Sequence, residues 1–307
     1  MTLDARTIDR IGLVVHPHRR LDRALSSVHA WAAEHDAEIV QVIIDGQERV
    51  VAEAGDASSC DLIIALGGDG TTLAALHAAA PYDIPVLGVA CGSLGALTAT
   101  SADRIDESLR RIATGAWQPR ILPGVAVSAD GGEPWVALND LVVVRKGAGQ
   151  VAIEIRIDGE LYVRFAGDGI VIASPLGSSA YTMAAGGPIL APGTAGVVLT
   201  PLAPHGGVAP PAVVSAQSVV TIAIEPSHAG ARVEFDGQMT DAQPRTLEVT
   251  WRARHATLVA FDDAESLLAG LRRRRILMDS PRLLARDDRA AATAAETPSA
   301  DALPASD

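Results

Sequence analysis

Cysteine and large aromatic rings are both scarce in this sequence of 307 residues. Only Cys60 and Cys91 occur, and no ligand pattern typical of zinc sites surrounds them. We expect two small buried thiols in a reducing compartment. Phe, Trp and Tyr make up 3% of the chain, whereas apolar residues make up 48%. The core must therefore be built from Val, Ile, Leu and Ala, a composition that favours layered α/β packing.

Long apolar runs and an excess of basic charge are also missing. No run approaches the roughly 20 residues needed to span a bilayer, and the opening MTLDARTIDR is charged and lacks the apolar core of a signal peptide. We therefore predict a cytoplasmic protein without a membrane partner. Acidic side chains outnumber basic ones by 37 to 25, for a net charge of −12. This balance argues against nucleic acid as a partner.

The first third of the chain alternates short apolar runs with helical spacing. Strands are expected over residues 11–15, 37–44, 61–66 and 84–89, with a helix over 21–35. Nearly continuous apolar strands separated by helices are typical of a parallel sheet covered on both faces. We predict an α/β domain over residues 1–125.

The second half has many short strands separated by Gly, Pro and Asp, which indicates an all-β domain over residues 126–261. The boundary is expected between residues 115 and 134, where Pro119, Pro123 and the turn at 130–132 interrupt the pattern. A helix over 262–278 is predicted to join the α/β domain. Residues 280–307 are rich in Ala, Asp, Pro, Ser and Thr, and we expect them to be disordered.

The sharpest local motif is LGGDGTTL at residues 66–73, directly after an expected strand and before a helix that should start near Thr72. Its three glycines leave backbone N–H groups and a helix N-terminus free to face phosphate oxygens. Asp69 is unfavourable beside phosphate unless it holds a metal or takes a proton, and phosphoryl transfer requires both roles. An ordinary glycine-rich turn with Asp as a helix cap remains the alternative.

A second motif, GDGIVIASPLGSSAYTMAAGGPIL, covers residues 167–190. A strand leads into a turn dense in hydroxyl residues and then into a short helix that ends at Gly-Gly-Pro. Hydroxyls, backbone amides and a tyrosine ring suit a purine and its ribose better than a metal. From composition alone the segment could also be a polar loop, and Asp168 marks a turn.

Together these segments resemble the NAD kinase family, in the same order from about residue 11 to 271. The shared motifs are GGDGT at 67–71, an Asn-acid pair at 139–140, the stretch at 167–190, LTPLAPH at 199–205 and DGQ at 236–238. The resemblance implies an α/β domain with a parallel sheet followed by an all-β domain, with the site in the cleft between them. It also implies phosphorylation of the adenosine-side ribose 2′-hydroxyl of NAD by ATP or polyphosphate with Mg²⁺, in a dimer or tetramer.

The resemblance also implies roles for particular residues. Asp69 would be the base or metal-linked carboxylate that activates the 2′-hydroxyl, and Asn139 and Asp140 would bind ribose hydroxyls. The phosphate path would be lined by Gly67, Gly68, Gly70 and Thr71. The adenosine and nicotinamide ends of NAD would be held by Ser174, Ser178, Ser179, Ala180 and Tyr181, with Asp168 hydrogen-bonding nearby and His205 at the edge of the site. No protein metal site is expected.

Some positions depart from the family pattern. Asp140 stands where the family usually has Glu, which shortens the reach of the carboxylate by one methylene. Ala90 and Ala96 stand where Asn and Phe are common, which opens the pocket. These changes keep open a second hypothesis, a protein that senses NAD(P) without turnover. A lipid kinase is a third, because such enzymes also have a GGDG loop, but the stretch at 167–190 argues against it.

Overall fold

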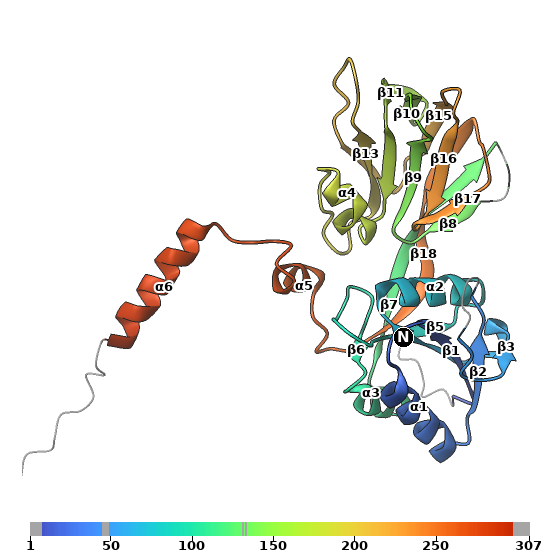
Figure 1. Cartoon of the computed structure of the whole chain (residues 1–307), viewed down its shortest axis with the longest axis vertical. Helices are drawn as coiled ribbons and strands as arrows, with labels where there is room; N and C mark the ends of the chain where they lie inside the picture. The colour runs from blue at the N-terminus through green and yellow to red at the C-terminus, as the bar shows by residue number, and fades with distance from the viewer. Residues whose placement is uncertain (1–7, 45–48, 131, 133, 297–307) are drawn as a thin grey trace, which may run out of the picture. The chain divides into compact units, whose positions relative to one another are not determined.

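A parallel sheet forms the α/β layer of the computed structural model, which describes residues 8–44, 49–130, 132 and 134–296 (Figure 1). Its strands run in the order β5-β4-β1-β2-β3. The bounds are β1 (Arg10–Val15), β2 (Glu38–Val42), β3 (Ala54–Gly55), β4 (Leu62–Gly67) and β5 (Pro85–Ala90), with the short β6 (Thr100–Ser101) beside β5. The predicted βα alternation is confirmed.

Side chains alternate along each strand, so successive residues point to opposite faces of this sheet, and both faces are buried. Ile11 and Leu13 of β1 pack in the same core cluster as residues of α1 (Asp22–Glu34) and α3 (Ile105–Ala113). Val14 points the other way, into a cluster with Ala75 and Leu76 of α2 (Asp69–Ala79). Helices thus cover the two faces, and this double burial explains why β4 and β5 are apolar along their whole length and β1 is apolar after Arg10.

The all-β layer is a sandwich of antiparallel strands. One sheet has the order β14-β13-β12-β9-β16-β17, and β11, β10 and β15 face it. Leu141, Ile170 and Leu199 from the first sheet share a core cluster with Ile153 and Ile222 from the second. The bounds are β9 (Asp140–Arg145), β10 (Val151–Ile157), β11 (Glu160–Gly167), β12 (Gly169–Ala173), β13 (Gly196–Leu202), β14 (Ala212–Ser215), β15 (Val220–Glu225), β16 (Ala231–Phe235) and β17 (Gln238–Thr240). The α/β-plus-β fold class is confirmed.

Two long strands, β7 (Gln118–Ala129) and β18 (Thr246–Ala260), pass from one layer into the other (Figure 1). They pair with each other in both layers; β18 also pairs with β15 and with β5, and β7 with β8 (Trp135–Ala137). The expected break at Pro119 and Pro123 does not occur, because both lie inside β7. Pro123 faces the register shift between Arg252 and Ala256, where its missing N–H leaves no ladder bond unmade.

The chain divides into two units, residues 1–264 and 265–307, each described by itself. The division of the first unit into residues 1–125 and 126–261 stays a prediction. In the second unit, α5 (Leu267–Arg273) begins after Ser266, whose hydroxyl accepts the Ala269 N–H, so this helix is shorter than the expected 262–278. Its predicted joining to the α/β domain is untested.

Helix α6 (Pro281–Glu296) occupies much of the segment for which composition predicted disorder. Its sequence contains several alanines, the residue with the highest intrinsic helix propensity, and has proline at the first position, where no N–H is needed. The prediction of disorder was based on the low content of large apolar residues and did not take this helix propensity into account. Residues 297–307 lie outside the described residues. No helix in the described part of the chain combines the length and apolarity needed to cross a membrane.

Candidate functional site

The GGDGT loop joins β4 to α2 at the carboxyl edge of the parallel sheet. Helix α2 begins at Asp69 with Gly68 as its N-cap, earlier than the expected start near Thr72. Thr72 explains the difference, because its N–H and its hydroxyl both donate to the Gly68 carbonyl at 3.0 Å. A Cβ on Gly67 would lie 2.1 Å from the Thr71 hydroxyl oxygen, whereas one on Gly70 would meet nothing within 4 Å. The loop therefore needs its first glycine for packing and is open at Gly70.

The carboxylate of Asp69 is held by backbone amides. Its Oδ2 accepts the N–H of Ala96 and its Oδ1 that of Leu97, each at 2.9 Å. A Cβ on Gly95 would lie 2.0 Å from Oδ1, so this approach requires glycine. Each oxygen retains a second lone pair. Asp69 is thus fixed at the start of α2 and can still accept a hydrogen bond from a substrate hydroxyl.

The loop that orients Asp69 is itself pinned at two points. The Thr98 hydroxyl oxygen accepts the Gly95 N–H at 2.8 Å, and the Arg120 guanidinium donates to the Ala96 carbonyl at 3.3 Å. Burial lowers the pKa of Arg120 from its ordinary value. Ala96, where the family commonly has a ring, therefore contributes through its backbone. Arg120 was missed in the sequence because β7 was not predicted.

Arg19 is a second residue that sequence reasoning missed. It follows β1, which is paired with β4, so the loops after these two strands meet at one edge of the sheet. The Arg19 Nη1 lies 3.4 Å from the Gly67 carbonyl oxygen, and a Cβ on Gly92 would lie 2.6 Å from the same nitrogen. Its guanidinium therefore lies against the glycine loop.

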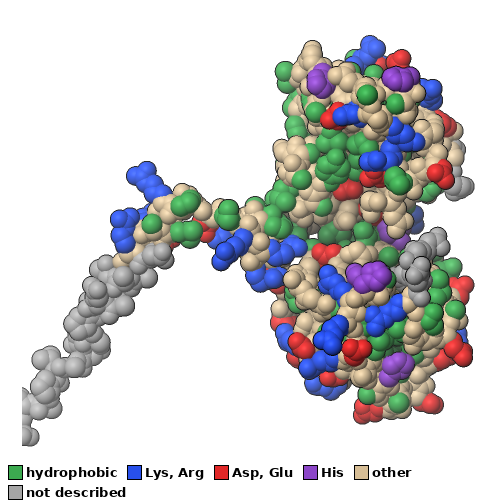
Figure 2. Space-filling model, in the orientation of Figure 1, with side chains coloured by type: hydrophobic (Ala, Val, Ile, Leu, Met, Phe, Trp, Pro, Cys, Tyr) green, Lys and Arg blue, Asp and Glu red, His purple; other side chains and the backbone are tan. Residues whose placement is uncertain are grey.

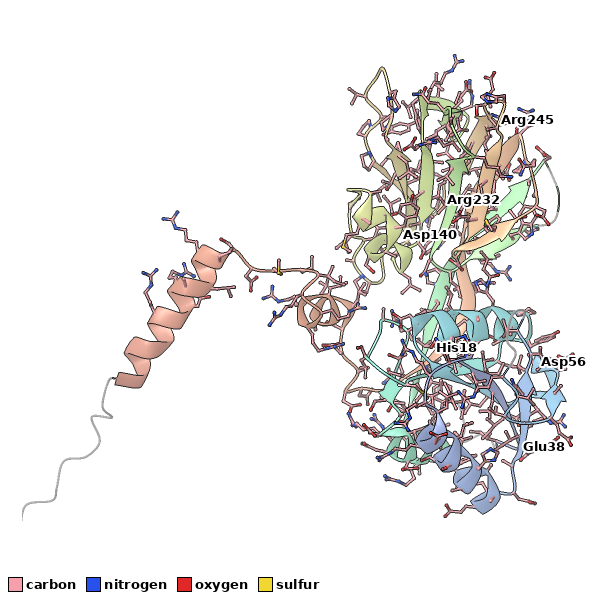
Figure 3. The ribbon with its side chains drawn as sticks, in the orientation of Figure 1. His18, Glu38, Asp56, Asp140, Arg232 and Arg245 are labelled. Carbon is pink, nitrogen blue, oxygen red and sulfur yellow. The ribbon has the colours of Figure 1, made fainter. Side chains whose placement is uncertain are left out.

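The loop carrying Arg19 is preorganised. His16 Nδ1 accepts the N–H groups of His18 and Arg19 at 3.1 and 3.3 Å, and the Arg49 guanidinium donates to the Arg19 carbonyl at 2.6 Å. Burial, and then the charge of Arg19, lowers the pKa of His16, which favours the neutral ring that this acceptor role needs. Figure 2 shows histidine and basic side chains together on the α/β layer, and Figure 3 labels His18 near α2. This edge can bind an anion.

On the β side, Asp236 organises the Asn139–Asp140 pair. Its Oδ1 accepts the N–H groups of Asn139 and Asp140 at 2.6 and 3.0 Å, and its Oδ2 accepts that of Leu138 at 2.8 Å. Asp236 has a φ of 51° in the turn between β16 and β17. The DGQ motif drew attention to this position, but no local signal shows that its carboxylate reaches residues so distant in sequence.

Asp140 differs from Asp69 in having its carboxyl group buried, with 6% of the residue exposed. Burial, then the charges of Asp236 and Glu234, raises the pKa of Asp140 to about 7. The protonated and ionised forms are therefore both populated near neutral pH. Such a group can either donate to or accept from a ribose hydroxyl.

The hydroxyl-rich segment is divided between structural and open positions. Ser174 donates to the Leu138 carbonyl at 2.5 Å, and Ser178 donates to the Pro175 carbonyl at 2.7 Å and accepts the Leu190 N–H at 2.9 Å. Both serines are fully buried. The remaining predicted residues lie in the short helix η3 (Gly177–Ser179) and at the start of α4 (Tyr181–Ala184), where Ser179 donates to the Leu176 carbonyl while Ala180 and Tyr181 are exposed.

Helix α2 connects the two halves of the site. His77, near its C-terminal end, lies with Nε2 2.6 Å from the Asp236 Oδ2, the oxygen that also accepts the Leu138 N–H. Leu138 belongs to the core cluster that Leu73 and Leu176 pack against. Eight residues separate Asp69 from His77, about 12 Å along a helix. Asp69 and the Asn139–Asp140 pair are thus connected through one rigid element, and each keeps its own hydrogen-bond partners.

Asp168 and His205 lie at the opposite end of β12 from this corner. Asp168 precedes the strand and Ser174 follows it, a span of about 20 Å at 3.3 Å per residue. Asp168 Oδ1 lies 2.5 Å from Nε of Arg145, and the His205 N–H donates to the Ala166 carbonyl at 2.8 Å. The structure therefore does not bring these two residues to Asn139 and Asp140.

Two protein-family models match this chain. The model of the ATP-NAD kinase N-terminal domain matches residues 11–117, and that of the C-terminal domain matches residues 138–261. This chain belongs to the NAD kinase family. The N-terminal match contains the GGDGT loop, and the C-terminal match contains the Asn139–Asp140 pair and Asp236.

Two bacterial NAD kinases illustrate the relationship. One from Heliobacterium modesticaldum is 39% identical over 184 residues, which is 58% of this chain and 65% of the relative. One from Koribacter versatilis is 30% identical over 247 residues, which is 77% of this chain and 87% of the relative. The chain thus spans just under two thirds of the first relative and most of the second.

Two solved structures share the two-domain fold of the NAD kinase family. A yeast NADH kinase complexed with NADH has a TM-score of 0.73 at 18% identity, covering 90% of this chain and 89% of that chain. An NAD kinase from Archaeoglobus fulgidus in complex with ATP has a TM-score of 0.68 at 24% identity, covering 86% of this chain and 98% of that chain. At these identities the likeness establishes the fold.

The donor set bears on how Mg²⁺ would be held. Within the described residues, no three His, Cys, Asp or Glu side chains gather to hold a metal ion. Asp69 is the carboxylate of the GGDGT loop, and two backbone amides occupy part of its hydrogen-bonding capacity. Mg²⁺ is commonly bound by one or two carboxylates together with substrate phosphates and water. The residues therefore fit an ion that is carried mainly on phosphate oxygens, with Asp69 as the nearest carboxylate of the loop.

Proposed function

We propose that this chain transfers a phosphoryl group from ATP or polyphosphate to the adenosine-side ribose 2′-hydroxyl of NAD, forming NADP. The proposal rests on one observation: helix α2 carries Asp69 at one end and, near the other end, contacts the carboxylate of Asp236. Asp69 is the first residue of α2, and His77 of the same helix is hydrogen-bonded to Asp236, whose carboxylate accepts the backbone N–H groups of Asn139 and Asp140. One helix thus sets the distance between a phosphate loop and a ribose-binding corner.

The donor phosphates would lie along residues 67–71. The free N–H groups and the positive end of α2 favour phosphate oxygens there, and Arg19 supplies a full positive charge beside Gly67. Mg²⁺, when bound to the phosphates, would neutralise charge that develops during transfer. Both ATP and polyphosphate present such oxygens, and the solved relative from Archaeoglobus fulgidus was crystallised with ATP.

The acceptor ribose would lie against Asn139 and Asp140, with Ala180 and the exposed Tyr181 beside the base. Asp69 would accept the proton of the 2′-hydroxyl as the oxygen attacks in line, while its two amide contacts keep the carboxylate oriented. Asp168 and His205, about a strand length away, would contact the far end of an extended dinucleotide. The yeast structure contains NADH, a ligand of the same kind.

The decisive experiment follows NADP formation by a coupled dehydrogenase. Purified protein is incubated with Mg²⁺ and NAD, with ATP or polyphosphate as donor in separate reactions. We expect NADP with at least one donor. Without NADP, stabilisation against heat by NAD would support a sensor. Labelled phosphate found only in a lipid extract would support a lipid kinase.

We further propose that the chain assembles as a dimer or tetramer through its β layer. β11 and β14 are end strands of the two β sheets. Apart from the bridge between Ala166 of β11 and His205, no further strand of the described residues pairs with the outer edges of these two strands. Leu161 on β11 and Val213 on β14 are 51% and 55% exposed. Light scattering coupled to size-exclusion chromatography should give a mass of two or four chains, and a mass of one chain would reject this assembly.

A further inference from the structure

A small pocket lies where β18 passes between the two layers, next to the residues that follow the C-terminal end of α2, whereas Asp69 is at the N-terminal end of that helix. Three residues of β18 stand opposite Pro123 there, because Arg252 pairs with Gly124 and Ala256 with Leu122. We call residues 252–256 the β18 bulge. The pocket has a volume of about 200 Å³. It is lined by the β18 bulge and by Ala80 and Asp83, which follow α2 in the short helix η2 (Ala80–Tyr82) and its C-cap.

Positive charge predominates around this pocket. Arg252 and Arg254 are exposed, and neither has a carboxylate partner among the residues that the structure describes. The one acidic lining residue, Asp83, accepts the Thr257 hydroxyl at 3.3 Å. The nearby helix-end carbonyls of Ala79 and Ala80 accept the amides of Ile84 and Asp83. Two arginines and one aspartate therefore line the pocket, which leaves an excess of positive charge.

His255 adds two polar atoms without partners. Both of its ring nitrogens are buried and make no hydrogen bond within the described part of the chain. Burial, then the charges of His77 and Arg252, lowers its pKa to about 4, so the ring is neutral at physiological pH. Buried polar atoms are rarely left unpaired in folded proteins, and exceptions often mark sites completed by water or an ion.

The size of the pocket limits what can occupy it. Pockets for drug-sized ligands usually measure about 300–1,000 Å³, so 200 Å³ is too small for NAD or ATP. Paired guanidinium groups bind phosphate oxygens through charge-assisted hydrogen bonds. We propose that the β18 bulge, with Arg252 and Arg254, forms a second anion site that binds a free compact phosphate anion such as pyrophosphate, separate from the GGDGT loop.

The site is placed to influence the ribose-binding corner. The ring of His255 lies 6.2 Å from that of His77, and His77 is bonded to Asp236, which holds the Asn139 and Asp140 amides. An anion bridging the β18 bulge and the end of α2 would stiffen the crossing between the layers. The binding itself does not depend on kinase activity, so it can be tested apart from the proposed function.

The test measures amide hydrogen exchange with and without pyrophosphate, with chloride added to match ionic strength. Pyrophosphate should slow exchange at residues 252–257 and 80–84, separately from any protection of residues 67–72 at the donor loop. The R252Q/R254Q variant should lose the first protection and keep the second. Its pyrophosphate affinity at the bulge should fall at least about tenfold. Circular dichroism checks that the variant folds.

The matched control is R110Q/R245Q, which removes two exposed arginines elsewhere; Arg245 is labelled far from α2 in Figure 3. This control should keep protection at the β18 bulge. The proposal is overturned if the wild-type bulge shows no protection, if R252Q/R254Q keeps it, or if the control loses it equally. A failed NADP assay with intact bulge protection would reject only the kinase proposal.

Discussion

Asp69 and Asp140 are the same residue type in the same proposed site, yet their surroundings are opposite. Asp69 accepts two backbone amides from the loop after β5. Asp140 is buried near Asp236 and Glu234, and its pKa rises to about 7. The first environment fixes the orientation of a carboxylate, and the second controls whether it carries a proton. Position on the fold, and not residue type, therefore separates a carboxylate that is oriented by amides from one whose protonation changes near neutral pH.

Asp69→Asn should have the largest effect, because it removes the carboxylate that the two amides orient. We expect the NADP-forming kcat to fall by about 100- to 10,000-fold, because the amide cannot accept the 2′-hydroxyl proton. The variant should still fold, with a loss of about 1–3 kcal/mol in the free energy of unfolding, because the amide oxygen accepts only one of the two backbone N–H groups that the carboxylate accepts. Coupled-assay kinetics and thermal unfolding measure both quantities. The matched control is Asp106→Asn on the exposed face of α3, which should keep full activity; near-normal turnover in Asp69→Asn would remove its assigned role.

Removal of the carboxylate that organises Asn139 and Asp140 should have the next largest effect. Asp236→Ala leaves three backbone N–H groups and His77 without their acceptor. We expect a loss of about 2–5 kcal/mol in the free energy of unfolding, together with a raised KM for NAD. Urea unfolding and initial-rate kinetics measure these changes. A KM unchanged in a folded variant would separate Asp236 from substrate binding.

Asp140→Asn tests whether the buried carboxyl group of Asp140 takes up a proton near neutral pH. The folded-state pKa of Asp140 lies above its ordinary value of 3.8, so folding takes up a proton between about pH 4 and 7. This contribution to stability is therefore complete below pH 4 and is lost as pH rises to about 7. The Asn variant has no such group to ionise. The difference in free energy of unfolding between the variant and the wild type should therefore shift by roughly 2–4 kcal/mol in favour of the variant from pH 4 to pH 8.

Urea unfolding of both proteins across this range provides the measurement. The wild type and the variant both contain His255, whose lowered pKa makes stability fall as pH drops from about 6.5 to 4. That contribution cancels in the difference between the two proteins. Parallel pH profiles would show that Asp140 ionises normally in the folded chain.

The smallest expected effect concerns the donor side. Arg19→Gln removes the positive charge beside Gly67, and we expect the KM for ATP or polyphosphate to rise about tenfold with little change in the KM for NAD. Arg20→Gln, at the next position of the same exposed loop, is the control and should leave both values near the wild type. An equal rise in both KM values would point to a general disturbance of the site.

Part of the site was predictable because its signals are local. The GGDGT motif, flanked by an apolar strand and a helix, places Asp69 at a strand-to-helix turn without knowledge of the rest of the fold. Its mistaken helix start came from treating Asp69 as a loop residue, whereas Gly67 and Gly68 alone make the turn. The strand and short helix of the hydroxyl-rich segment occur where the sequence predicted them, but the structural use of Ser174 and Ser178 depends on contacts with Leu138 and Leu190.

By itself, the sequence determined the alternation of strands and helices, the all-β second half and the motifs of the NAD kinase family. These features depend on periodicity and on residues adjacent in the chain. Only the tertiary structure decided that the Arg19 guanidinium contacts the Gly67 carbonyl and that the Asp236 carboxylate accepts the Asn139 N–H. It also decided that Asp140 is buried. Each of these results depends on segments brought together by packing, 48 residues apart in the first case and 97 in the second, and no short-range pattern records such contacts.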